Sequence, residues 1–260
     1  MVIKFFSQTT GFIYCILALF VIIVLWKKGL MSRKIRSVFL FASVLSGFLF
    51  FSPVAPYQFQ TVFLRNLSSH GSPAVFVVFG LLFIAIVSFV IGRIFCGNIC
   101  PVGALQEIIS AVPVKKRGKY LKKYYVFIRF FVFIAFLVLA VLFSISLIGI
   151  LGIKDFFTLN MLSISFYVFL IFVILSFFIY RPFCRFICPY GLFLSLLAIK
   201  SRYKFRRTDL CIDCRKCETV CPVDEAKAGD NKSECYMCGR CVDVCPVKGA
   251  LVYSSEFKKE

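Results

Sequence analysis

The sequence predicts an all-α polytopic membrane protein that carries a small cysteine-rich domain at its C-terminal end. Three observations lead to this prediction. Hydrophobic residues make up 60% of the 260 residues, with 34 phenylalanines, an apolar share above that of ordinary soluble domains. Apolar stretches long enough to cross a bilayer recur through the first 180 residues. Most of the 13 cysteines then crowd into the segment 211–245.

Five apolar stretches are the candidate transmembrane helices. They cover approximately residues 9–26, 37–56, 72–92, 130–153 and 160–180. A spanning helix needs about 20 mainly apolar residues, which each stretch approaches. The first is kept as a span because it shows no small-residue cleavage site of the kind that ends a signal peptide. We therefore expect a helical membrane domain over residues 1–200 and a separate domain over residues 201–260.

The charge distribution predicts how these helices are oriented. The chain has 31 lysines and arginines against 12 acidic residues, a net charge of +19. The basic residues gather between the first and second stretches, between the third and fourth, and after the fifth. The positive-inside rule places these segments in the cytoplasm. We expect a multi-pass protein of a bacterial or archaeal inner membrane with a cytoplasmic C-terminal domain. This distribution favours the membrane over nucleic acid as the partner of the basic residues.

The C-terminal cysteines repeat one spacing, C-x2-C-x2-C-x3-C-P. This spacing predicts two [4Fe–4S] clusters in which the fourth cysteine of each run binds the other cluster. The alternatives are a pair of zinc sites or a disulfide framework, but zinc sites usually show paired C-x2-C units instead of this run. The predicted ligands are Cys211, Cys214, Cys217 and Cys245 for one cluster, and Cys221, Cys235, Cys238 and Cys241 for the other. The domain is thus expected to be an α+β ferredoxin of the bacterial two-cluster type.

The membrane domain contains an internal repeat. The segment Arg93–Gly103 matches Arg181–Gly191, which begins 88 residues later, and both contain a C-x3-C-P motif, at 96–101 and 184–189. Each copy follows an apolar stretch that runs toward the cytoplasm. We expect two helical hairpins of the same orientation, related by an axis along the membrane normal.

The C-x3-C-P motifs supply a second group of cysteines, made up of Cys96, Cys100, Cys184 and Cys188. Cysteines at i and i+4 share one face of a helix, and we expect Pro101 and Pro189 to end or kink that helix. The repeat would bring the two pairs together. Four hypotheses remain open for them: a further metal or iron–sulfur centre, a redox-active disulfide, the wall of a quinone pocket, or a structural role at helix ends.

Other polar residues near the spans are candidates for function. Arg93 and Arg181 are charges at membrane depth, which either stabilise a charged site or snorkel to the headgroups. Oxidation of a quinol would also require proton acceptors. The candidates are Gln106 and Glu107 near the first motif and His70 and Asp155 near the outer face.

The paired C-x3-C-P motifs and the eight-cysteine tail together resemble the polyferredoxin-type membrane electron-transfer proteins, such as the NapH-type quinol dehydrogenase subunit. The resemblance covers residues 37–255, and the additional N-terminal span departs from the four spans of that type. The resemblance implies electron transfer between the quinone pool and a redox partner protein. Whether the chain is itself an enzyme, as a quinol dehydrogenase or oxidoreductase subunit, is left open. One alternative is a maturation or regulatory protein that reduces a metal ion or a thiol for another enzyme. Another is a ferredoxin-like module that only anchors a soluble redox enzyme.

Overall fold

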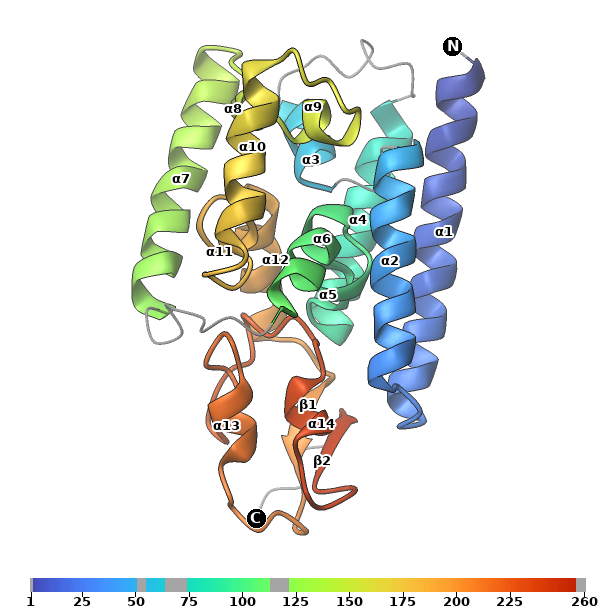
Figure 1. Cartoon of the computed structure of the whole chain (residues 1–260), viewed down its shortest axis with the longest axis vertical. Helices are drawn as coiled ribbons and strands as arrows, with labels where there is room; N and C mark the ends of the chain where they lie inside the picture. Colours follow the sequence, from blue (N-terminus) through green and yellow to red (C-terminus); the bar gives the residue numbers. More distant parts are fainter. Residues whose placement is uncertain (1, 51–54, 64–73, 113–121, 256–260) are drawn as a thin grey trace.

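The computed structural model describes residues 2–50, 55–63, 74–112 and 122–255. Helices α1 to α12 form a helical body, and the remaining elements form a C-terminal region beyond one end of it (Figure 1). The longer helices of the body are α1 (Val2–Lys27), α2 (Arg33–Phe50), α4 (Ala74–Ile91), α7 (Lys122–Leu142) and α10 (Ile164–Leu175). The shorter ones are α3 (Ala55–Phe63), α5 (Ile94–Asn98), α6 (Pro101–Ser110), α8 (Leu147–Ile150), α9 (Ile153–Phe157), α11 (Pro182–Phe186) and α12 (Pro189–Ile199).

Within the described residues, two helices are long and apolar enough to cross a membrane, judged by length and composition. They are Thr10–Lys27 within α1 and Tyr124–Leu142 within α7. The first coincides with the expected span at 9–26. Three further apolar helices are shorter, at Val77–Ile91, Ile164–Leu175 and Pro189–Ile199. The structure is mostly helical, as expected, and the number of spans stays a prediction.

The boundaries of several expected spans differ from the helices. The expected span 130–153 is wrong because α7 ends at Leu142 and Ser144 adopts a left-handed backbone, with φ of 54°. The two serines that follow Phe143 favour local backbone hydrogen bonds over a continued helix. The expected span 160–180 holds a helix only over α10. Within 37–56, α2 begins earlier, at Arg33, and residues 51–54 lie outside the described residues.

The C-x3-C-P motifs break the helix in a way that the sequence analysis did not predict. Cys96 lies in α5, whereas Cys100 is the N-cap of α6, so the two thiols do not share one helix face. Pro101 is the first residue of α6 and begins a helix instead of ending one. Proline suits this position because its missing N–H would have no helical partner there. Cys184, Cys188 and the second proline repeat this arrangement in α11 and α12.

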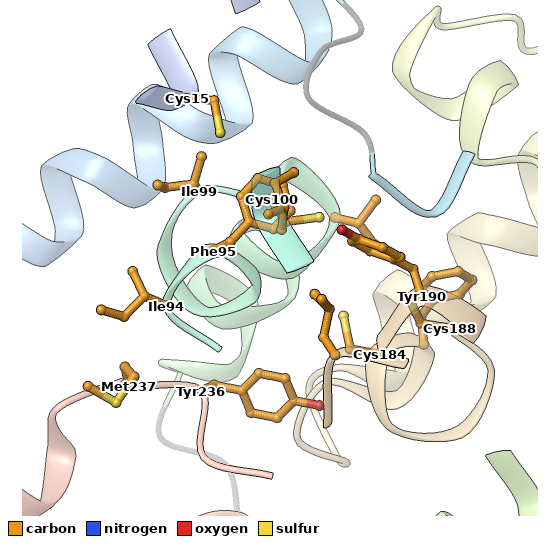
Figure 2. Packing of buried hydrophobic residues seen from close by; sticks show 14 of the residues in the cluster. Cys15, Ile94, Phe95, Ile99, Cys100, Cys184, Cys188, Tyr190, Tyr236 and Met237 are labelled. Atoms are coloured by element: carbon orange, nitrogen blue, oxygen red, sulfur yellow. The ribbon is translucent and has the colours of Figure 1, made fainter. Parts of the chain in front are cut away.

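The internal repeat is visible in the element order, because α4–α5–α6 and α10–α11–α12 follow the same plan. The two copies pack against each other, and the hydroxyl of Tyr190 in α12 donates to the Leu81 carbonyl in α4, at 2.9 Å. Gly47 of α2 allows a close approach to α6, since a Cβ there would lie 2.6 Å from that of Pro101. The C-x3-C-P motif segments lie in the buried core of the protein (Figure 2).

The C-terminal region is a small α+β unit. Strands β1 (Lys204–Arg207) and β2 (Leu251–Ser254) pair antiparallel, with Phe205 opposite Tyr253. The short helices α13 (Lys216–Val220) and α14 (Arg240–Asp243) lie between them in the chain. The sheet contacts the body, because Trp26 packs edge-on against Phe205 at 4.9 Å and the Tyr253 hydroxyl donates to the Ile91 carbonyl at 2.9 Å.

Candidate functional site

Two cavities in the C-terminal region are lined by cysteines. The inner cavity, about 510 Å³, also touches Tyr180 of the body and is lined by Cys217, Cys221, Cys235, Cys238 and Cys241. The outer cavity, about 380 Å³, is lined by Cys211, Cys214, Cys217 and Cys245. Each cavity therefore carries one complete set of the four predicted ligands. Cys217 lines both, so the cavities are neighbours.

The arrangement of these thiols fits a cluster better than a single ion. A cubane binds one thiolate at each of its four iron corners, so its ligands surround a space. Among the described residues, no group of three or more His, Cys, Asp or Glu side chains is placed to hold one metal ion, and every cysteine is a free thiol. The backbone N–H of Glu225 donates to the Cys221 sulfur at 3.3 Å, a contact that stabilises a thiolate.

The two cavities differ in their surroundings. The inner cavity lies against the body, with Tyr180 and Tyr236 in its wall, and both side chains are buried. The outer cavity lies beside Cys214, which is exposed, and Ile212, which is 65% exposed. An electron carrier in the outer cavity would therefore be near the surface, and one in the inner cavity would be near the body.

The four cysteines of the C-x3-C-P motifs belong to the hydrophobic core of the protein. Cys100, Cys184 and Cys188 are buried in this core (Figure 2), and the partly buried Cys96 packs against it. All four are free thiols, so the structure holds no disulfide between them. The backbone N–H of Gly191 donates to the Cys188 sulfur at 3.2 Å. The Cys188 sulfur is near enough to Cys96, Cys100 and Cys184 to interact with them electrostatically, which agrees with the expectation that the repeat brings both pairs together.

The arginines of the two motifs are buried and paired. Arg93 and Arg181 are 1% and 0% exposed, so they do not snorkel to a surface. Arg181 donates from Nε to Glu107 Oε2 at 2.9 Å, and from Nη1 to the Cys96 carbonyl at 2.6 Å. Arg93 donates from Nη1 to Glu234 Oε2 at 2.8 Å. Both charges are therefore held at the buried cysteines by carboxylates.

Each of these carboxylates also pairs with a second arginine. Glu107 Oε1 accepts from Arg240 Nη2 at 2.8 Å, which gives the first triad, Arg181–Glu107–Arg240. Glu234 Oε1 accepts from Arg129 Nη2, which gives the second triad, Arg93–Glu234–Arg129. Both triads join the helical body to the C-terminal region.

The triads keep their carboxylates ionised. Burial raises the pKa of Glu107, but the guanidinium groups of Arg181 and Arg240 outweigh it and lower the pKa to about 2. Burial likewise raises the pKa of Glu234, and its two arginines lower it to about 2. Each triad therefore carries a net positive charge next to the buried thiols, a charge suited to an anionic group bound there.

Tyr236, which follows a predicted cluster ligand, lies between the two motif arginines. Its ring centroid is 4.5 Å from the Arg93 guanidinium and 4.8 Å from that of Arg181. Its backbone fits against Gly97, where an added Cβ would lie 1.7 Å from the Tyr236 carbonyl oxygen. The segment that lines the inner cavity is therefore inserted between the two motifs.

The other candidate residues have different surroundings. Both amide atoms of Gln106 are buried without a hydrogen-bond partner among the described residues. Asp155 lies in α9, at the end of the body away from the C-terminal region (Figure 1), and accepts from the Ser163 hydroxyl at 2.6 Å. His70 lies outside the described residues. Among the described candidates, Glu107 is the one whose hydrogen bonds lead to the C-x3-C-P cysteines, through Arg181.

Sequence reasoning missed four residues of the site. They are Arg129, Glu234, Tyr236 and Arg240. Arg129 could have been found, because it is an isolated charge within the apolar run Tyr124–Leu142, and such charges are usually paired or functional. The others lie among the cluster cysteines, where no local pattern separates a docking residue from a solvated one.

Comparison with known proteins supports iron–sulfur binding by this chain. A 4Fe-4S binding domain family matches residues 73–120 and 164–208, and a 4Fe-4S dicluster domain family matches 203–246. The chain is 32% identical over 193 residues to "Uncharacterized protein MJ0750" of Methanocaldococcus jannaschii. The matched region covers 69% of this chain and 79% of that protein. This chain belongs to the MJ0750 family.

Other relatives match a smaller part. "Putative electron transport protein YccM" of Escherichia coli is 31% identical over 58% of this chain and 47% of its own length. "Uncharacterized protein MJ0749" of M. jannaschii is 30% identical over 53% of this chain and 54% of its own length. The chain thus spans about half of these two proteins. No solved structure matches it. The two domain matches support iron–sulfur clusters as cofactors of this MJ0750-family chain.

Proposed function

We propose that the chain is a membrane-bound iron–sulfur electron-transfer protein that connects the quinone pool with a redox partner protein. The observation that carries this proposal is the pair of neighbouring cavities, each lined by one complete set of four cysteines. A [4Fe–4S] cluster supplies one-electron chemistry when it is bound. The similarity to YccM, whose name describes an electron transport protein, supports the same function.

The order of the sites supports a direction through the molecule. The buried C-x3-C-P cysteines come first, the inner cavity follows behind Tyr236, and the outer cavity lies nearest the surface. Beside the outer cavity, Leu210 and Ile212 are 59% and 65% exposed. Apolar side chains around an exposed redox site suit the docking of a partner protein. In this proposal the C-x3-C-P cysteines hold a further iron–sulfur centre.

The membrane placement extends the same proposal. Residues 1–200 form the membrane domain, residues 201–260 the ferredoxin domain, and the latter faces the cytoplasm. The two long apolar helices and the basic segments support this placement. The arrangement in five spans and the role of a NapH-type quinol dehydrogenase subunit belong to the proposal as well.

A groove beside the inner cavity supports the quinone link. It lies open to solvent between α2, α6 and α14, and Cys238 lines both the groove and the inner cavity. One part of its wall is apolar, with Leu40, Phe41 and Ile108. The rest carries charged side chains, those of Arg33, Arg36, Glu107, Arg240 and Asp243. A wall divided in this way suits a ligand with a polar ring and an apolar tail, and a quinol is such a ligand.

Reduction by a quinol tests the proposal directly. Anaerobically purified protein in lipid vesicles is mixed with a menaquinol analogue, and the clusters are observed by electron paramagnetic resonance. We expect cluster signals to appear. In Ala111→Trp, which narrows the groove, we expect reduction to slow, whereas Ala135→Trp on the exposed face of α7 should behave as wild type. Failure of every quinol to reduce the wild type contradicts the quinone link.

A further inference from the structure

The two copies of the internal repeat differ at a position that contributes to the site. Residues 88 apart correspond, so Arg93 matches Arg181 and Gly103 matches Gly191. By the same offset, Glu107 of the first copy matches Ser195 of the second. The second copy therefore lacks the carboxylate that pairs with the motif arginine in the first triad.

The motif arginines themselves keep the symmetry. Arg181 of the second copy reaches into the first, where its Nη1 lies 3.1 Å from the position of a Cβ at Gly103. Arg93 of the first copy reaches into the second, where its Nη2 lies 3.2 Å from the position of a Cβ at Gly191. The two guanidinium groups thus occupy matching places, each beside the other copy's cysteines.

Glu234 of the C-terminal region occupies the place of the missing carboxylate. It accepts from Arg93 Nη1 at 2.8 Å, as Glu107 accepts from Arg181. It also shares a donor with Ser195, because Arg129 Nη2 donates both to Glu234 and, at 3.1 Å, to the Ser195 hydroxyl. A carboxylate at position 195 would therefore lie within reach of the same arginines.

A second departure from symmetry lets the C-terminal segment in. Gly97 of the first copy corresponds to Arg185 of the second. Only the glycine leaves room for the Tyr236 backbone, which brings Glu234, two residues earlier, to the second copy's arginine pair. Arg185 instead lies over the ring of Tyr125, with its guanidinium 4.0 Å from the centroid.

We infer that Glu234 is a positioning residue that replaces the carboxylate missing from the second repeat and holds Arg93 at the C-x3-C-P cysteines. The buried cysteine site is thus complete only when the C-terminal region is docked. The inference rests on the proposed function, in which these cysteines take part in electron transfer. If Glu234 only anchored the C-terminal region, nothing would require it to occupy the position equivalent to that of Glu107 or to pair with the equivalent motif arginine.

The test uses thiol reactivity and a rescue that the symmetry predicts. In the full-length, anaerobically purified protein, alkylation of Cys184 and Cys188 by a maleimide is followed by mass spectrometry. Partners of ligand side chains typically change metal-site affinity about 10–100-fold when they are mutated. We expect Glu234→Gln to accelerate alkylation by a factor in this range. Adding Ser195→Glu should return the rate to within about threefold of wild type.

A matched control separates positioning from docking. Asp243→Asn removes another ion pair between the two regions, Arg36–Asp243, without touching Arg93. We expect it to leave the alkylation rate near wild type. An unchanged rate in Glu234→Gln overturns the inference. So does equal acceleration by Asp243→Asn with no rescue by Ser195→Glu, because Glu234 would then be only an anchor.

Two further outcomes are also decisive. Should Glu234→Gln alone not accumulate as folded protein, recovery of the double variant supports the inference and its loss contradicts it. The alkylation result does not depend on any quinol. A wild type that no quinol reduces would therefore refute the quinone link and leave the inference about Glu234 standing or falling by its own test.

Discussion

At the scale of single residues, the exchange of the fourth cysteines between the two cluster sites leads to the first prediction. Cys221 lines the inner cavity with Cys235, Cys238 and Cys241, although it is closer in sequence to Cys217. We expect Cys221→Ser and Cys238→Ser to change the same component of the paramagnetic resonance spectrum, because they affect one cluster. Cys245→Ser should change the other component. If Cys238→Ser and Cys245→Ser alter one shared component instead, and Cys221→Ser the other, the exchange is wrong.

Gly97 gives a second residue-scale prediction. A Cβ there would lie 1.7 Å from the Tyr236 carbonyl oxygen, so Gly97→Ala must displace backbone. Overpacking of this kind costs about 1–3 kcal/mol. We expect faster hydrogen exchange over residues 234–238 and a lower free energy of unfolding. Gly229→Ala is the control, since nothing lies within 4 Å of a Cβ at that position. Equal exchange in both variants would contradict the close approach.

The cysteines could be predicted from the sequence and their arginine partners could not. Cluster ligands follow a local spacing, which survives in any fold that forms the loops. The pairs Arg93–Glu234 and Arg181–Glu107 join residues 141 and 74 positions apart. Such contacts depend on how the two regions dock, and the sequence alone leaves several partners equally reasonable.

At the scale of elements, the expected helix through each C-x3-C-P motif was wrong for a definite reason. Proline ends a helix when it follows one and favours a helix when it occupies the first position. Pro101 does the second, so the motif is the junction of α5 and α6. The junction places the two thiols of a motif on different elements, so they do not share a helix face.

The first triad gives a prediction about how α6, α11 and α14 hold together. Glu107→Gln leaves Arg181 buried without its carboxylate, which typically costs about 3–5 kcal/mol. We expect the free energy of unfolding in urea at pH 7 to fall by that amount. Arg36→Gln, which removes a more exposed pair, should cost less. An equal or smaller loss in Glu107→Gln would show that the triad is not a main contact.

The same pair predicts a pH dependence. The folded pKa of Glu107 is about 2 and its unfolded pKa about 4.3, so the ionised form stabilises the folded state above pH 4.3. This contribution is lost as the pH falls toward 2. The difference in stability between wild type and Glu107→Gln should therefore shrink from pH 5 to pH 2. A constant difference over that range would mean that the carboxylate does not act through its charge.

At the scale of the whole molecule, the predicted topology can be checked by protease access. The basic segments predict that the C-terminal region lies in the cytoplasm. A C-terminal epitope tag should resist protease in intact spheroplasts and be cleaved in inverted membrane vesicles. Cleavage in intact spheroplasts would reverse the orientation and with it the side on which the partner protein docks.

The central claim is that the eight cysteines of residues 211–245 hold two clusters. Its most direct test is the amount of iron and acid-labile sulfide per chain after anaerobic purification. We predict about 8 irons and 8 sulfides per chain for two [4Fe–4S] clusters, and more if the C-x3-C-P cysteines hold a further centre. Protein that contains zinc, with neither iron nor sulfide, would contradict the account.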